Sequence, residues 1–67
     1  MKLTVNGDMF ETIANISVID LLKEKRVESP DMVAVEINNE IIRKEAYSHI
    51  ELRENDQVEF LYFMGGG

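Results

Sequence analysis

The chain has 67 residues, a formal charge of −6 at pH 7 and no cysteine. This length holds one small domain with one small core and leaves little room for an enclosed catalytic pocket, and the absence of cysteine excludes a disulfide framework and a thiol nucleophile. The acidic charge disfavours nucleic acid as a partner and favours a basic protein surface, unless it serves solubility alone.

The first residues predict a β-hairpin over residues 1–13. Leu3 and Val5 alternate with polar residues, as in a strand with one buried face. Asn6-Gly7 favours a type I′ turn, because both residue types accept a positive φ, and Met9–Ile13 forms the returning strand. This segment lacks the apolar stretch of a signal peptide, and no run approaches the roughly 18–20 residues of a membrane span. We therefore expect a soluble cytoplasmic protein with no membrane partner.

A helix is predicted over residues 18–26. Ser17 and Asp20 have the spacing of a capping box, and Ile16 stands where a hydrophobic staple would lie. One face of this helix carries Val18, Leu21, Leu22 and Lys25. A helix with such a face buries it against another element.

The second half of the chain predicts three further strands. They cover residues 33–37, 40–43 and 57–63, with turns at 38–39 and 54–56 and a single helical turn at 44–47. One helix and about five strands predict an α+β domain, in which the main helix packs on one face of a mixed sheet. The first and last strands would lie side by side at its centre. This is the β-grasp, or ubiquitin-like, architecture, with a domain over 1–64 and a flexible tail over 65–67.

The last strand separates a helix-facing side from an outward side. Alternation directs three side chains toward the helix, namely Val58, Phe60 and Tyr62. The candidate docking residues for a partner protein are the apolar ones on or near the outward side, namely Leu61, Phe63, Met64 and Ala34. The alternative is that these side chains only cover a sheet edge.

No catalytic or metal site is predicted. His49 is the single histidine, and no cysteine exists to pair with it. The carboxylates of Glu51, Glu54, Asp56 and Glu59 lie close in sequence but lack the spacing of a calcium loop. We therefore expect no catalytic residue, no metal and no cofactor bound by this chain.

The sequence closes with Gly65-Gly66-Gly67, which follow the last predicted strand and Met64. Glycine has no Cβ, so such a tail can enter a channel too narrow for other residues. Three extended residues reach roughly 10 Å, enough to carry the Gly67 carboxylate into another protein's active site. The alternative is a frayed end or a cloning remnant.

The pattern of residues 33–42, then 52–59, then the terminal glycines resembles the ThiS family of thiamine-biosynthesis sulfur carriers. The resemblance covers essentially the whole chain, including the hairpin and the helix. Two positions depart from it. Members often carry Pro before the Arg that follows the fourth strand, where this chain has Ile42, and many have Gly where this chain has Asn55.

The resemblance implies that Gly67 is adenylated by a ThiF-like enzyme, which holds the ATP and Mg²⁺. A persulfide donor would then convert the adenylate to a thiocarboxylate, which a ThiG-like thiazole synthase would use to build the thiazole of thiamine. Gly65 and Gly66 would thread the partner active sites, and Leu61 and Phe63 would dock. The chain itself would be a carrier and not an enzyme.

The same sequence features also fit other functions. A molybdopterin-synthase small subunit (MoaD-like) shares this fold and tail, and a ubiquitin-like protein modifier would use the same terminus. A non-covalent β-grasp binding module is the alternative of another class. Removal of Gly67 would abolish the function of a carrier and spare that of such a module.

Overall fold

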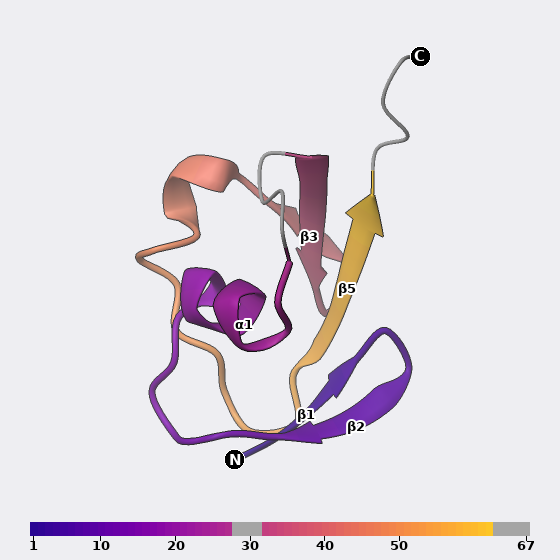
Figure 1. Ribbon diagram of the computed structural model, residues 1–67, viewed down its shortest axis with the longest axis vertical. Coiled ribbons are helices and arrows are strands. Elements are labelled where there is room, and N and C mark those ends of the chain that lie inside the picture. The colour runs from indigo at the N-terminus through magenta and orange to yellow at the C-terminus, as the bar shows by residue number, and fades with distance from the viewer. Residues whose placement is uncertain (28–31, 63–67) are drawn as a thin grey trace.

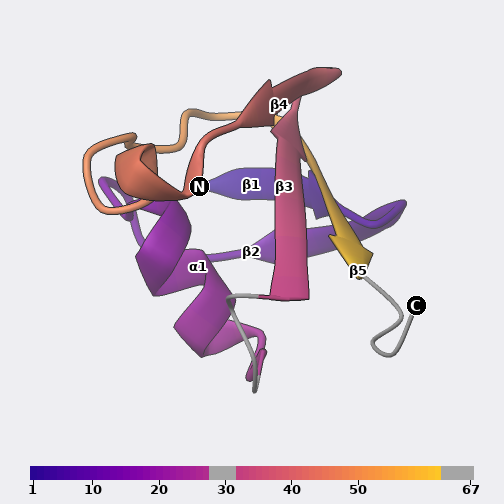
Figure 2. The same ribbon diagram turned by 90° about the horizontal axis from the view of Figure 1, so that it is seen from above.

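The structure is a computed structural model that describes residues 1–27 and 32–62. Its elements, in chain order, are β1 (Lys2–Val5), β2 (Asp8–Glu11), α1 (Val18–Glu24), β3 (Val33–Ile37), β4 (Glu40–Ile42), the 3₁₀ turn η2 (Lys44–Ala46) and β5 (Gln57–Tyr62). The described strands form one sheet in the order β2-β1-β5-β3-β4. Figures 1 and 2 show α1 and η2 on the same side of this sheet. The predicted α+β, β-grasp architecture is confirmed.

The first and last strands lie together at the centre of the sheet, as predicted. β1 and β5 run parallel, and Val5 is the register partner of Val58. The β1–β2, β3–β4 and β3–β5 pairs are antiparallel. Because parallel neighbours need a long crossover, α1 and the segment after it can pass over one face before the chain returns to the centre.

Asparagines make the tight turns, because they tolerate the left-handed backbone region better than most residues. Asn6 and Gly7 have φ values of 52° and 87°, which confirms the predicted hairpin turn. Asn38 and Asn39, at the turn between β3 and β4, also have positive φ values, of 51° and 72°. Asn55 has a φ of 70°. It therefore adopts the conformation for which the resembling family often uses glycine.

The predicted capping box opens α1. The Asp20 backbone N donates to Ser17 Oγ at 3.2 Å, and the Ser17 backbone N donates to Asp20 Oδ2 at 3.3 Å. The predicted end at residue 26 is wrong by two residues, because the chain turns out of the helix at Arg26, whose φ is 58°. Lys25 was also expected on the apolar face but is exposed, and its Nζ lies 4.6 Å from the Phe10 ring centroid.

The core lies between α1 and the sheet. Its buried side chains are Leu3, Val5, Ile16, Val18, Leu21, Leu22, Val33, Val35, Tyr47, Leu52, Val58 and Phe60. The segment after η2 holds the start of the helix, since Val18 N donates to Ile50 O at 3.0 Å and Leu52 N to Ile16 O at 2.9 Å. The Tyr47 hydroxyl donates to Val33 O at 3.2 Å, which links this segment to β3.

Candidate functional site

The end of β5 is the candidate site, because it is where the described chain leads into the glycine tail. Val58 and Phe60 face the core with 1% and 6% of their surface exposed, as predicted. Leu61 points to the other face and is 42% exposed. Its register partner on β3 is Ala34. The structure thus brings together two of the predicted docking residues on the outer face of the sheet.

The remaining predicted site residues are Phe63, Met64, Gly65, Gly66 and Gly67, and they lie outside the described residues. The proposed boundary between a domain at 1–64 and a tail at 65–67 lies there too. The part of the site that the structure describes is therefore the last two residues of β5 and their neighbours.

Tyr62 was predicted to face the helix together with Val58 and Phe60, but the helix does not cover it: 57% of its surface is exposed. Tyr62 does follow Phe60 on the helix-facing side by alternation. Figure 1 shows that β5 continues past the body of α1, so its last residue reaches beyond the helix that covers the earlier ones. Strand periodicity gives the face of a side chain but not the length of the layer above it.

Two turn asparagines hold the body of β5. Asn6 Oδ1 accepts from Phe60 N at 2.8 Å, and Asn6 N donates to Val58 O at 2.9 Å. On the β3 side, Asn38 Oδ1 accepts from Gln57 N at 2.9 Å and Asn38 N donates to Gln57 O at 2.7 Å. Sequence reasoning assigned both asparagines to turns and missed this second role, because no local pattern reveals a partner so far along the chain.

Two like charges face each other on the outer surface of the sheet. Glu36 on β3 and Glu59 on β5 are register partners, one row below the Ala34–Leu61 pair. Within the part of the chain that the structure describes, neither carboxylate takes part in an ion pair or a hydrogen bond. Like charges directly opposite on neighbouring strands destabilise a sheet, so this pair lowers the stability of the free chain.

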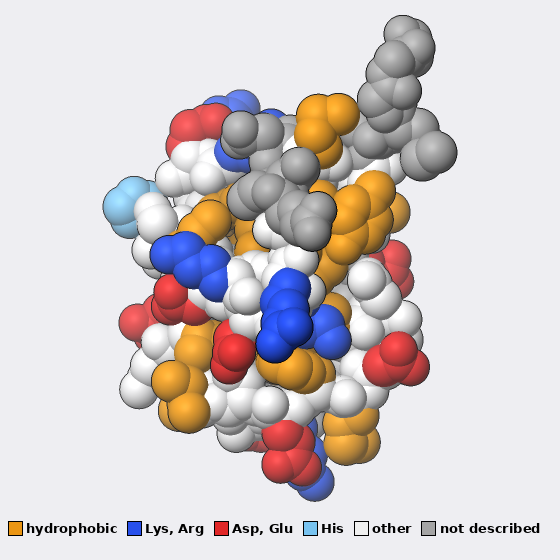
Figure 3. Space-filling view, viewed as in Figure 1, with side chains coloured by type: hydrophobic (Ala, Val, Ile, Leu, Met, Phe, Trp, Pro, Cys, Tyr) orange, Lys and Arg blue, Asp and Glu red, His pale blue; other side chains and the backbone are white. Residues whose placement is uncertain are grey.

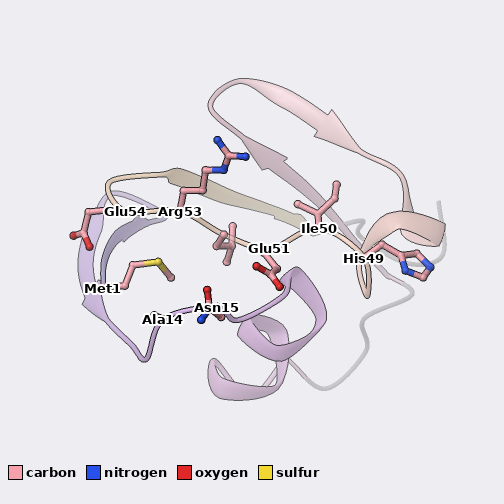
Figure 4. A pocket seen from close by; sticks show the side chains of 9 residues that line it. Met1, Ala14, Asn15, His49, Ile50, Glu51, Arg53 and Glu54 are labelled. Carbon is pink, nitrogen blue, oxygen red and sulfur yellow. The ribbon is translucent and has the colours of Figure 1, made fainter.

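A hollow lies between the β2–α1 connection and the segment before β5. It is lined by Met1, Ala14, Asn15, His49, Ile50, Glu51, Leu52, Arg53 and Glu54. Figure 4 shows the His49 ring at one end of it, away from the Arg53 and Glu54 side chains. His49 is exposed. No group of three or more potential metal ligands occurs among the described residues. The hollow presents no catalytic arrangement.

Among the titratable groups of the described residues, Tyr47 has a pKa that departs from its ordinary value. Burial raises its pKa above the ordinary 10.0, an effect that a backbone hydrogen bond with Val35 partly offsets. Its hydroxyl is already used in the bond to Val33 O. This tyrosine is thus part of the packing.

No helix in residues 1–27 or 32–62 is long and apolar enough to cross a membrane.

Comparisons with known proteins agree with this architecture. A sequence model of the ThiS family matches residues 3–67. The sulfur carrier protein ThiS of Bacillus subtilis is 43% identical over 51 residues, which are 76% of each chain. Thiazole synthases of Paramagnetospirillum magneticum and Magnetococcus marinus are 40% and 34% identical over all 67 residues. The chain spans only 20% of the length of those two proteins.

Solved structures with this fold include relatives at substantial sequence identity. The crystal structure of the thiamine biosynthesis protein (ThiS) from Geobacter metallireducens superposes with a TM-score of 0.88 at 40% identity, and each chain is covered completely. A solution structure of a thiamine biosynthesis protein from the same organism gives a TM-score of 0.81 and is covered over 88% of its length.

Proposed function

The chain belongs to the ThiS family of sulfur carriers in thiamine biosynthesis, and we propose that Gly67 is the residue that carries the sulfur. The observation that supports this best is the extent of the family match, which runs from residue 3 through Gly67 and so includes the three glycines. β5 ends at Tyr62, and two residues separate it from the first of these glycines.

The proposed chemistry activates the Gly67 carboxylate. One carboxylate oxygen attacks the α-phosphorus of ATP, which forms an acyl-adenylate and releases pyrophosphate. The terminal sulfur of a donor persulfide then attacks the acyl carbon and displaces AMP, leaving an acyl disulfide. A second thiol attacks the donor-side sulfur, so that a donor disulfide and the Gly67 thiocarboxylate result. The carrier supplies the acyl group and its partners supply ATP, Mg²⁺ and sulfur.

The chain acts as a co-substrate and not as an enzyme in this proposal. The described residues offer no nucleophile–base pair, and the reacting group is the terminal carboxylate. A ThiF-like adenylating enzyme would hold ATP and Mg²⁺, and a thiazole synthase would receive the sulfur. The two longer relatives named thiazole synthase support the second partner, since each contains a segment similar to this whole chain. The reaction would take place in the cytoplasm, where ATP is abundant.

In this proposal the glycine tail and the end of β5 contact different parts of the partner. Gly65 and Gly66 would thread the active-site channel, because only residues without a side chain pass a narrow opening close to the backbone. Leu61 and Ala34 would dock on the partner together with Phe63 and Met64. The named relatives are thiamine proteins, which favours this pathway over molybdopterin synthesis.

Intact-mass spectrometry tests this function directly. The full chain is incubated with an adenylating enzyme, Mg-ATP and a persulfide donor. Conversion of the terminal carboxylate to a thiocarboxylate adds about 16 Da, and one methionine sulfoxide adds the same mass, so alkylation and mapping of the C-terminal peptide accompany the measurement. An alkylatable, ATP-dependent gain on Gly67 is expected. Absence of any gain with an enzyme that activates another carrier would contradict the proposal.

A further inference from the structure

Large apolar side chains are exposed on both faces of the sheet at the end of β5. Leu61 is 42% exposed, Tyr62 57% and Met32 40%. Met32 directly precedes Val33, which is the register partner of Tyr62, so it lies at the same end of the sheet. Figure 3, in the same view as Figure 1, shows hydrophobic side chains gathered over the upper end of β5. We call Leu61, Tyr62 and Met32 the collar.

The collar has members on both faces of the sheet. Leu61 lies on the outer face, next to Ala34, and Tyr62 lies on the opposite face, in line with Phe60. A partner that docks only on the outer face would cover Leu61 and leave Tyr62 in water. Exposed apolar groups on both faces of a strand end indicate a partner that contacts both faces.

We propose that the adenylating enzyme closes around the collar with an apolar rim at the entrance of its active-site channel, and so contacts both faces of β5. This inference rests on the proposed function and adds to it a two-sided contact with Tyr62 as a binding residue. The rim would be apolar because the side chains that it meets are apolar.

The length of the tail argues for this occupant. Five residues, 63–67, separate the collar from the reacting carboxylate. Fully extended, they span about 17 Å, so the strand end must reach the mouth of the channel. An acyl-adenylate is hydrolysed by water, and a closed site prevents this side reaction. Apolar side chains around the point of entry would exclude water in the way that the rim of an interface protects its centre.

The fixed position of β5 makes such a contact efficient. Asn6 N donates to Val58 O and Asn6 Oδ1 accepts from Phe60 N, and these two bonds hold the strand up to the residue before Leu61. A collar on a strand that is already ordered loses little conformational freedom on binding, which leaves more of the contact energy as affinity.

Three matched variants of the full chain test the inference by calorimetric titration with the adenylating enzyme, without ATP or sulfur donor. Leu61→Thr and Tyr62→Thr each remove one face of the collar, and threonine keeps the strand propensity at both sites. Met9→Thr is the control, since Met9 is 72% exposed on β2, two strands from β5. We expect Kd to rise at least about fivefold for each collar variant and by less than about twofold for the control. Thermal unfolding midpoints establish that all three fold.

The outcomes separate this inference from the function on which it rests. Wild-type affinity of Tyr62→Thr, together with weak binding of Leu61→Thr, would mean one-sided docking and would overturn the collar. Equal affinity of all three variants and the wild type would overturn it as well. If the wild-type chain gains no ATP-dependent mass, the proposed function itself fails, and the inference fails with it. A normal gain by wild type alongside unchanged affinities removes the collar alone.

Discussion

Asn6 Oδ1 accepts a hydrogen bond from the backbone N of Phe60 at 2.8 Å, although 54 positions separate the two residues. The bond continues the ladder between β1 and β5 by one step past the end of β1, with a side chain in place of a backbone carbonyl. A residue of the first turn thus fixes the strand that leads to the tail.

Asn6→Gly should lower the free energy of unfolding by about 1 kcal/mol, because it keeps the positive φ and removes the acceptor of Phe60 N. Urea denaturation measures this change, and the Phe60 amide should exchange its hydrogen faster. Asn6→Asp retains an oxygen at the same place and is the control. Equal exchange of the Phe60 amide in the glycine variant and the wild type would contradict the role of this bond.

Tyr47→Phe should cost about 0.5–1.5 kcal/mol at neutral pH, because it removes the hydrogen bond to Val33 O inside the core. Equilibrium unfolding in urea measures the loss, with Tyr62→Phe as a control for an exposed tyrosine. A phenylalanine variant as stable as the wild type would show that water satisfies the Val33 carbonyl equally well.

The raised pKa of Tyr47 predicts how the stability of the folded chain depends on pH. Since burial raises the pKa of Tyr47 in the folded state, the folded chain binds the phenolic proton more tightly than the unfolded chain. This contribution is complete below the ordinary pKa of 10.0 and is lost as the pH rises through the folded value. Unfolding curves between pH 8 and strongly alkaline conditions should therefore show a fall above about pH 10 that is smaller in Tyr47→Phe. An identical fall in both proteins would rule out this cause.

Local patterns predicted most of the fold and only part of the site. Alternation and turn chemistry located the five strands, and the Ser17–Asp20 spacing located the start of the helix. Tyr47 was placed in a helical turn but not in the core, because burial there depends on how the segment passes over the helix. The exposure of Tyr62 was missed for a related reason, since the length of the covering layer is a tertiary property. The second role of Asn6 needs a partner that only the folded chain brings near.

Glu59→Gln should raise the free energy of unfolding by a few tenths to about 1 kcal/mol, because it removes the repulsion with Glu36 on the neighbouring strand. Thermal or urea unfolding at low and high salt measures the gain, which should shrink as salt screens the pair. Glu11→Gln is the matched control, since Glu11 faces Lys2 across β1 and β2 and its loss removes the same formal charge.

The Glu36–Glu59 pair also bears on partner binding. A chain with a charge of −6 associates with a basic docking surface faster than a neutral chain would. Glu36 and Glu59 lie next to the Ala34–Leu61 pair and so close to the proposed contact. Glu59→Gln should therefore slow association with the adenylating enzyme more than Glu11→Gln does, when rates are measured by stopped flow at low salt. If Glu59→Gln is not more stable than the wild type, the two carboxylates do not repel each other across the strands.

Gly66→Val should reduce formation of the Gly67 thiocarboxylate at least about tenfold while leaving the thermal unfolding midpoint unchanged. A β-branched side chain next to the reacting residue widens the tail where the proposed channel admits only backbone. The core of the described residues lies in α1, the sheet and the segment after η2, so this change should not affect stability. Mass spectrometry after reaction with adenylating enzyme, Mg-ATP and persulfide gives the yield. Ala14→Val adds comparable bulk at an exposed position beside the hollow in Figure 4 and should react normally. Full conversion of Gly66→Val would show that the partner does not enclose the tail closely, and the threading role proposed for Gly65 and Gly66 would then be wrong.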